Sequence, residues 1–579
     1  MKAGSVLKFS AYVLLLTGLA FAQSPIVGGQ VRISVDNNSL SGNETSAASS
    51  ANGQDIVAGF NDWRPDGTIK SSFGTSSDGG QTWSHVIVRP PVANQTTVEG
   101  DPMACYDART NTLWVGAISF AGNGGIYIAK KNLGSNTYQA STMARLSGSA
   151  DKCWMTAGPI PGNSNTTRLY ITYNEGVIRS DDLGTTFTSP TSLGTGLGFL
   201  PRVGPNGELY VCYWDDNLRV QFKRSLNGGT SFSTFTAATR MDTWGTESPN
   251  GRVPGNYRIA PINTMAVNPV DGTIVIMYFD TTNTIGSNRN LDLYMVKSTN
   301  QGTTWTTPTR LPFRPLTTVG DMFFPWVEYT SDGRLHLTAY DTIYTSQNDG
   351  ITHGMVDEDY AYSDDNGATW SKFRLTPNSY DSFNDGRGSS TSFLGDYEGI
   401  AMTDRRVWAT YPDTHTGQAE VYANSVYNPI VRPASLSFVW GTQTGGTLQS
   451  LFLQDGNVVT ATRGVPPLAS TPPLQMALTA TSPYTNPSSV QLYLWTSVST
   501  PNLQQDVLVY NVAAQRWDTL DSRAAPQSQT NTVVNVPNPQ NYIGPNGLMQ
   551  ARVTYRAVGA TLTLAWTANT DEAVFLENP

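Results

Sequence analysis

Acidic and basic side chains of changing type recur just before short apolar segments along the first 400 residues. They are Glu99, Asp101, Asp151, Lys152, Arg202, Arg258, Asp321, Asp396 and Glu398. Carboxyl groups close to arginine or lysine have perturbed pKa values, which acid–base chemistry requires. We therefore expect a functional site where these positions meet. An internal network of ion pairs that fills a pore would give the same pattern, and this alternative stays open.

A second set of carboxylates follows the next apolar segment of each repeating unit. It consists of Asp62, Glu175, Asp215, Asp280, Asp341 and Asp413. A ring of carboxylates resembles a metal or substrate site, so a structural calcium ion stays open, although no motif specifies a cofactor. The same residue type in nearly every unit is more typical of turn capping.

The elements that must position these residues are marked by a repeated turn, Ser-x-Asp-x-Gly-x-Thr-Trp. Its five copies start at Ser76, Ser180, Ser225, Ser298 and Ser363, and a decayed copy contains Asn132, Gly134, Thr137 and Tyr138. The Asp or Asn side chain accepts backbone N–H groups, the glycine supplies a positive φ, and the aromatic ring fills an apolar gap. Each copy therefore predicts a turn between two strands, with a structural rather than catalytic aspartate.

These turns resemble the Asp-box, or bacterial neuraminidase repeat, of the sialidase-like β-propellers, and the resemblance covers about residues 31–428. Seven runs of β-branched and aromatic residues mark the second strand of each unit: Ile56–Phe60, Leu113–Ile118, Leu169–Tyr173, Leu209–Trp214, Ile274–Phe279, Leu335–Tyr340 and Val407–Tyr411. The last unit is one strand short, and the spare segment Val31–Asp36 would complete it and close the ring. Seven blades are therefore favoured over six.

The rest of the chain predicts an export signal and a second domain. Residues 1–22 carry lysines, an apolar run and Ala20-Phe21-Ala22, which are typical of a secretory signal peptide. Residues 23–429 form the predicted propeller. Residues 430–579 lack the repeat, and their short strands predict an accessory β-sandwich. Its expected strands are Leu448–Leu453, Val490–Thr496, Val507–Val512, Ala551–Ala557 and Thr561–Trp566.

Composition narrows the partners of the 579-residue chain. Only 14% of its residues are charged, against about 25% in ordinary proteins. The net charge of −9 argues against nucleic acid or an anionic membrane surface. The first apolar run is too short to span a membrane and no second one follows it. We expect a monomer that binds an extracellular glycan or glycoprotein. Cys105, Cys153 and Cys212 predict small buried residues more than a disulfide, although Cys105–Cys153 is the plausible pair.

The resemblance implies hydrolysis of a glycosidic bond, which needs two carboxylates that flank the bond. Asp321, Asp396 and Glu398 border the long insertions Thr342–Tyr360 and Pro377–Leu394, and they are the preferred acid and base. Asp101 lies in the same set. A third insertion is Thr239–Tyr257. Long loops on a rigid scaffold usually carry function, so the site is expected at the face opposite the boxes.

A sialidase would also need a tyrosine nucleophile and arginines for the substrate carboxylate. Tyr397 is a candidate nucleophile, and the candidate substrate-binding residues are Arg64, Lys152, Arg202, Arg258, Arg387, Trp63 and His353. The chain departs from the sialidase pattern, because it lacks the Arg-Ile-Pro tripeptide ahead of the first box. Exo-sialidase activity is therefore in doubt. Two alternatives stay open: a polysaccharide lyase that uses His353, and a non-catalytic carbohydrate- or protein-binding propeller.

Overall fold

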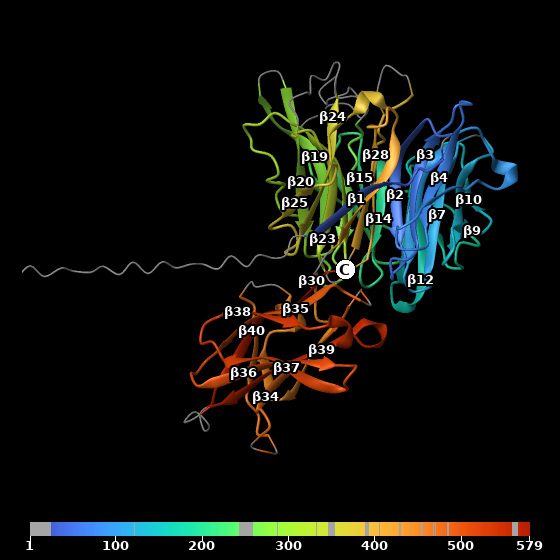
Figure 1. Ribbon diagram of the computed structural model, residues 1–579. Coiled ribbons are helices and arrows are strands. Elements are labelled where there is room, and N and C mark those ends of the chain that lie inside the picture. Colours follow the sequence, from blue (N-terminus) through green and yellow to red (C-terminus); the bar gives the residue numbers. More distant parts are fainter. Residues whose placement is uncertain are drawn as a thin grey trace, which may run out of the picture. The chain divides into compact units, whose positions relative to one another are not determined.

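The computed structural model describes residues 25–578, apart from 37, 121, 242–258, 286–287, 332, 345–353, 388–392, 404–405, 428–429, 453–455, 467, 469, 483, 485 and 559–564. The predicted signal peptide lies outside these residues. The chain forms two compact units, Val27–Tyr427 and Asn428–Pro579. Both consist of strands with a few short 3-10 helices (Figure 1). No helix in the described part of the chain is long and apolar enough to cross a membrane.

The first unit contains seven antiparallel sheets among its described residues, which we number in chain order. Sheet 1 has β2 (Ser41–Ser49), β3 (Ile56–Trp63), β4 (Ile69–Ser76) and β5 (Ser84–Ile87). Sheet 2 has β6 (Glu99–Asp107), β7 (Thr112–Ser119), β8 (Gly125–Asn132), β9 (Thr137–Tyr138) and β10 (Thr142–Leu146). Sheet 3 has β11 (Trp154–Ile160), β12 (Asn163–Tyr173) and β13 (Gly176–Ser180). Sheet 4 has β14 (Leu197–Val203), β15 (Leu209–Trp214), β16 (Val220–Ser225) and β17 (Ser233–Ala238).

The remaining sheets of this unit follow the same order. Sheet 5 has β18 (Thr264–Val267), β19 (Ile274–Ile285), β20 (Asn288–Ser298) and β21 (Thr309–Arg310). Sheet 6 has β22 (Met322–Tyr329), β23 (Leu335–Asp341), β24 (Met355–Ser363), β25 (Ser371–Arg374) and β26 (Tyr380–Asp381). Sheet 7 has β27 (Gly399–Met402), β28 (Arg406–Asp413), β29 (Glu420–Tyr427) and β1 (Ile26–Arg32). Two 3-10 helices, η1 (Val92–Asn94) and η2 (Ser382–Asn384), lie between strands.

The first strands of the seven sheets contact one another in a closed circuit. Contacts run from β2 through β6, β11, β14, β18 and β22 to β27, and β27 contacts β2 again. Sheets that radiate from a ring of inner strands form a β-propeller. The seven expected second strands all lie in β-strands, from β3 to β28.

The N-terminal strand β1 completes sheet 7, where it pairs with β29 as the outermost strand. Pairing of the two chain ends in one sheet removes a free edge from the ring. The expected strand, Val31–Asp36, was placed too late in the chain, because regular pairing ends at Arg32. Beyond it the amides of Ile33 and Ser34 both donate to the carbonyl of Val421, at 2.8 and 3.3 Å, which is not a regular ladder.

The repeated turns have the hydrogen bonds that their residue types predict. In the first, Asp78 Oδ1 accepts from the Thr82 amide at 2.9 Å and from the Ser76 hydroxyl at 2.8 Å. Gly80 has a φ of 80° and donates its amide to Ser76 Oγ at 2.9 Å. The corresponding side chains at the other four turns, Asp182, Asn227, Asn300 and Asp365, accept the same amide at 2.8–3.1 Å. The prediction of a capped turn is confirmed at all five copies.

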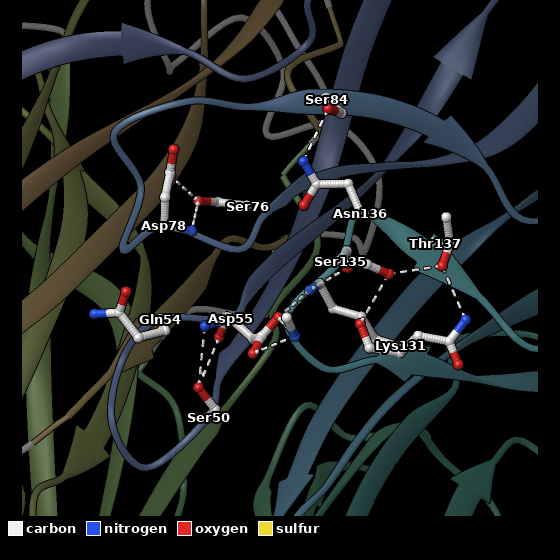
Figure 2. Close-up of polar contacts among 12 residues, drawn as sticks. Ser50, Gln54, Asp55, Ser76, Asp78, Ser84, Lys131, Ser135, Asn136 and Thr137 are labelled. Atoms are coloured by element: carbon white, nitrogen blue, oxygen red, sulfur yellow. Dashed lines mark hydrogen bonds and ion pairs between the residues drawn. The ribbon is translucent and has the colours of Figure 1, made fainter.

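The decayed sixth turn, in sheet 2, takes its carboxylate from sheet 1. Asp55 lies in the turn between β2 and β3, and both of its oxygens accept the Gly134 amide, at 2.9 and 3.1 Å. Figure 2 shows the same carboxylate beside Lys131, with which it forms a buried ion pair. Lys131 also donates to the Ser135 carbonyl at 2.8 Å. Sheets 1 and 2 are therefore joined at the end of the ring that carries the boxes.

Two of the expected insertions contain regular structure. Met355, within Thr342–Tyr360, begins β24, and Pro377–Leu394 contains β26 and η2. These segments were wrongly expected to be loops throughout, because their polar residues concealed strand pairing with sheet 6. Most of Thr239–Tyr257 lies outside the described residues. Cys105, Cys153 and Cys212 are buried and free, as favoured over a disulfide.

The second unit contains two antiparallel sheets that share one apolar core. One sheet has β30 (Ile430–Val431), β32 (Thr442–Gly445), β33 (Val459–Thr462), β35 (Ser489–Val498), β38 (Thr530–Val536) and β40 (Thr567–Asn578). The other has β31 (Ser435–Trp440), β34 (Leu474–Thr481), β36 (Leu503–Asn511), β37 (Arg516–Ala524) and β39 (Leu548–Ala557). The 3-10 helices are η3 (Leu448–Leu451), η4 (Pro539–Asn541) and η5 (Pro545–Gly547). The strand expected at Leu448–Leu453 was wrong, because a Thr447–Ser450 capping box starts η3 there.

Candidate functional site

A short segment just before β27, residues 395–398, reaches from sheet 7 to side chains of sheets 3 and 6. Asp396 forms an ion pair with Lys152 of sheet 3. The ring of Tyr397 meets Trp154 edge to face, with centroids 5.3 Å apart. Glu398, two residues beyond Asp396, contacts Glu358 on β24 of sheet 6. We call residues 395–398 the strap.

Two groups of side chains meet at the strap. The first, which we call the Lys152 cluster, consists of Glu44, Asp101, Lys152, Asp396 and Tyr397, from sheets 1, 2, 3 and 7. The second is the carboxyl pair Glu358 and Glu398. Every member of both groups is 6% exposed or less.

The backbone that carries the Lys152 cluster is unusual. Glu44, Asp101 and Lys152 have φ values of 57°, 50° and 48°, in the left-handed region that favours glycine. The pairing register of β2 shifts between Asn43 and Ser46, and that of β6 shifts between Gly100 and Met103. Bulges of this kind redirect side chains and are common beside functional sites. Left-handed residues other than glycine cost about 1–3 kcal/mol each, so packing around them must hold this conformation.

Hydrogen bonds fix the carboxylates of the cluster. Asp101 Oδ2 accepts from the Lys152 amide at 2.7 Å. The side chain of Asn61, on β3, accepts from the Asp101 amide at 3.0 Å and donates to Glu44 Oε2 at 2.6 Å. Asp396 pairs with the ammonium group of Lys152, and the charges of Glu44, Asp101 and Asp151 also act on it.

This excess of buried negative charge shifts the pKa values of the cluster. Burial raises the pKa of Asp101 to about 6, although the charge of Lys152 opposes the shift. Burial alone would lower the pKa of Lys152, but Asp396, Glu44 and Asp101 raise it above its ordinary value. Lys152 is therefore charged at neutral pH, whereas Asp101 titrates within reach of neutrality.

Burial also raises the pKa values of the carboxyl pair. Burial raises the pKa of Glu398 to about 8, although contacts with Glu358 and Tyr340 oppose the shift. Burial and the charge of Glu398 together raise the pKa of Glu358 well above its ordinary value. Two adjacent buried carboxyl groups resist ionising together, because their like charges repel. The pair therefore retains at least one proton at neutral pH.

Tyr397 is less suited to nucleophilic chemistry in this conformation. Its hydroxyl group is buried and has no hydrogen-bond partner among the described residues. Burial, followed by the charges of Asp101 and Glu44, raises its pKa well above the ordinary value. A tyrosine nucleophile needs a neighbouring base that helps its hydroxyl group to lose the proton. Asp101 and Glu44 instead raise the pKa of this hydroxyl group.

Other expected site residues lie away from the strap. Asp321, just before β22, accepts from the Leu291 amide at 2.8 Å and donates its own amide to Thr342. Arg202 forms an ion pair with Glu328 and lies 5.8 Å from the ring of Trp326. Asp321 and Arg202 were expected beside Asp396 and Glu398. The structure places them in separate contacts of sheets 4 to 6.

The candidate arginines do not form one cluster among the described residues. Arg64 forms an ion pair with Asp36 at 2.7 Å and a second ion pair with Asp62, near the end of β3. Arg387 bonds to Asp385 at 3.0 Å, and its guanidinium lies 4.9 Å from the ring of Trp63. Arg258 and His353 lie outside the described residues.

Sequence reasoning missed Glu44, Glu358, Asn61 and Trp154. Glu44 lies within the inner strand β2, and it was missed because no charged neighbour marks it in the sequence. Glu358 lies between Asp357 and Asp359, which bind Arg374 and Lys372 respectively. Neighbouring side chains of a strand point to opposite faces. This alternation would have predicted that Glu358 points away from Asp357 and Asp359.

Three of the six carboxylates in the second set cap turns, as expected, whereas Asp62 and Glu175 accept hydrogen bonds from side chains. Asp215, Asp341 and Asp413 each accept from the amide two residues further on, at 3.0, 2.8 and 2.8 Å. No group of three or more His, Cys, Asp or Glu side chains in the described ranges is arranged to hold a metal ion. The described residues therefore offer no such group of side chains as ligands for a structural calcium ion.

Comparisons with known proteins give distant likenesses. Residues 454–564 match a domain of unknown function, DUF8815. No curated protein matches the chain. A protein of unknown function from Dyadobacter fermentans is 13% identical, with a TM-score of 0.41 over 70% of this chain and 99% of its own.

Two further solved structures have titles that name an activity. Penicillium chrysogenum α-L-arabinanase, complexed with arabinobiose, is 14% identical, with a TM-score of 0.37 over 69% of this chain and 98% of its own. Trypanosoma rangeli sialidase is 10% identical, with a TM-score of 0.36 over 95% of this chain and 96% of its own. Likenesses at this level assign neither a family nor a substrate to the chain.

Proposed function

We propose that this protein is an extracellular seven-bladed propeller with a C-terminal β-sandwich, and that it hydrolyses glycosidic bonds. The observation that carries the proposal is the pairing of two kinds of proton-binding carboxyl group at one strap. Glu398, with Glu358, has a pKa of about 8, and Asp101 has a pKa of about 6. A hydrolase needs an acid that is protonated and a base that is ionised at the same pH.

The roles follow from these protonation states. Between about pH 6 and pH 8, the Glu358–Glu398 pair retains a proton that it can donate to a leaving oxygen. Asp101 is mainly ionised in the same interval and can accept a proton from water. Lys152 holds Asp396 and thereby fixes the strap that carries Glu398. Export of the enzyme rests on the predicted signal peptide at residues 1–22.

Exo-sialidase activity is not part of the proposal. Arg202 and Arg64 form separate ion pairs with carboxylates of the protein. A sialic acid carboxylate would have to displace these partners. The missing Arg-Ile-Pro tripeptide argues in the same direction, and a lyase reaction would rely on His353, whose structure is not described.

One observation favours a second candidate, a non-catalytic glycan-binding propeller. Asp396 and Glu398 are 0% and 1% exposed, and most charges of the expected site are paired within the protein. A network that is closed in this way can serve as a plug that stabilises the inner ring. In that case the glycan would bind to the outer loops, and the strap would carry no chemistry.

A glycan panel separates the two candidates. Purified full-length protein is incubated with neutral and acidic polysaccharides, and released reducing sugar and unsaturated uronate are measured. Glu398→Gln and Asp101→Asn should each lower hydrolysis by at least 100-fold. Asp78→Asn is the matched control, because asparagine already occupies this box position at Asn227 and Asn300.

Each outcome of the panel decides between these alternatives. Loss of activity in both E398Q and D101N but not in D78N supports the proposal. Full activity in E398Q and D101N would contradict the site, and loss in Asp321→Asn or Arg258→Ala instead would move it to those residues. Binding of a glycan without any hydrolysis would establish the non-catalytic candidate, and unsaturated products would establish a lyase.

A further inference from the structure

In the described part of the first unit, sheet 3 differs from the other sheets because it has only three strands in regular pairing. The segment that would be its fourth strand follows the second box and runs through Thr188, Ser189 and Pro190. It keeps only a few backbone contacts with β13, among them the Thr188 amide to the Arg179 carbonyl at 3.0 Å and a bridge between Val177 and Thr191. A proline without an amide donor is poorly suited to a regular ladder.

The incomplete edge of sheet 3 borders a groove beside β10 of sheet 2. The groove has a volume of about 460 Å³, within the range of small-ligand sites, roughly 300–1,000 Å³. Its lining comprises Asn94, Met143, Ala144, Arg145, Leu146, Phe187, Thr188 and Ser189. Four of these side chains are apolar and four can form hydrogen bonds, and Leu146 is 61% exposed.

A bulge in β10 gives Arg145 its direction. The pairing of β10 with β8 shifts register between Met143 and Arg145, and bulges turn a side chain out of its regular position. The Nε atom of Arg145 is buried and has no partner among the described residues. The half-buried guanidinium also lies close to Tyr173 and Glu175, and it adds polar groups to the lining of the groove.

The wall carries little net charge. The pKa of Glu175 is lowered first by a hydrogen bond from Ser147, and the nearby charge of Arg145 contributes. Glu175 also accepts from Ser149 at 2.8 Å and from the Tyr173 hydroxyl at 3.1 Å. The carboxylate is therefore ionised and balances Arg145, so the groove does not select an anionic ligand.

We propose that this groove binds a neutral oligosaccharide. Phe187, a half-buried box aromatic, presents an apolar surface on which the C–H face of a sugar ring can pack. Arg145, Thr188 and Ser189 supply hydrogen bonds to sugar hydroxyl groups. The ligand class rests on the proposed function, but the site is separate from the strap and requires no hydrolysis. It would hold a polysaccharide on the side of the ring.

The test measures binding of neutral hexaoses to the full-length protein by saturation-transfer NMR and calorimetry. The probes are xylohexaose, cellohexaose, mannohexaose and arabinohexaose, with trigalacturonate as the anionic comparison. At least one neutral hexaose should bind, and Arg145→Gln and Phe187→Ala should each weaken it at least tenfold. Phe232→Ala is the matched control, because Phe232 is the half-buried aromatic of the next box.

The outcomes distinguish this groove from the strap. Unchanged binding in R145Q and F187A, or no binding of any hexaose, would overturn the proposal. Binding of trigalacturonate alone would overturn the neutral class. R145Q should leave hydrolysis of a small soluble substrate unchanged, whereas E398Q should leave hexaose binding at the groove unchanged. An inactive enzyme that still binds through Arg145 would therefore contradict only the proposed function.

Discussion

The box turns and the region around the strap shift the pKa values of their carboxyl groups in opposite directions. At the box end, Asp78 and Asp182 accept several N–H and O–H groups, and these hydrogen bonds lower the pKa of Asp182 to about 2. For Asp78 burial opposes a similar shift, but hydrogen bonds from Thr82 and Ser76 outweigh it. At the strap, burial dominates, and it raises the pKa values of Asp101 and Glu398 to about 6 and about 8.

The difference shows how to separate a structural carboxylate from a chemical one. A carboxylate that accepts three or more donors is stabilised in its ionised form and contributes to folding at neutral pH. A buried carboxyl group with few donors retains its proton, weakens the fold when ionised, and is available for proton transfer. Asp78 and Asp182 in the boxes belong to the first kind, and Asp101 and Glu398 belong to the second.

The largest expected effect comes from removal of the only ammonium group in the Lys152 cluster. Lys152→Met leaves Asp396, Asp101 and Glu44 buried without a cation. Loss of one partner of a buried ion pair typically costs about 3–5 kcal/mol. Urea unfolding should therefore show a loss of this size in the first unit. A loss below about 1 kcal/mol would mean that solvent reaches the cluster.

A smaller effect concerns the pH dependence of stability. Because the folded-state pKa of Glu398 is raised from 4.5 to about 8, the native state binds more protons than the unfolded state between these values. The free energy of unfolding should then fall as pH rises through this window, by about 1.4 kcal/mol per pH unit for each retained proton. Glu398→Gln should flatten the decline in urea unfolding measured from pH 5 to pH 8. An equal decline in wild type and variant would contradict the shift.

The smallest losses of stability are expected from substitutions in the box turns. Asp78→Ala removes the acceptor of the turn and should cost about 1 kcal/mol. Asp78→Asn should cost less than about 0.5 kcal/mol, because an amide oxygen accepts the same amides at Asn227 and Asn300. Neither variant should alter the fall in the free energy of unfolding above pH 5, because the pKa of Asp78 is lowered and its carboxylate is already ionised there. Thermal unfolding at pH 7 measures both, and an equal loss in the two variants would show that the charge itself is required.

Local patterns predicted most of the first unit. The five turns and the seven second strands follow from residue types within a few positions of one another, so spacing alone locates them. The closing role of the N-terminal segment was also predicted, although its bounds were displaced by several residues. In the second unit, Leu448–Leu453 was expected to be a strand because it is apolar, whereas the capping residues beside it start a 3-10 helix.

The candidate site was predicted only in part, because its contacts join distant parts of the chain. Asp101, Lys152, Asp396, Tyr397 and Glu398 lie together, but Asp321, Arg64, Arg202 and Arg387 do not join them. Position along an inner strand does not determine the direction of a side chain at a bulge, and Glu44 and Asp101 both lie at bulges. The contact between Glu358 and Glu398 depends on how sheet 6 meets the strap, which no local pattern encodes.

The most direct test of the account is an infrared titration of the protonated carboxyl groups from pH 5 to pH 9. The decrease of the C=O band of protonated acid should include one step near pH 6 and one near pH 8, besides the contributions of other buried carboxyl groups with raised pKa values, such as Asp359 and Glu328. Asp101→Asn should remove the first step and Glu398→Gln the second, whereas Asp78→Asn should remove neither. A protein whose carboxyl groups are all ionised at pH 5 would contradict the claim that the strap holds protons near neutral pH.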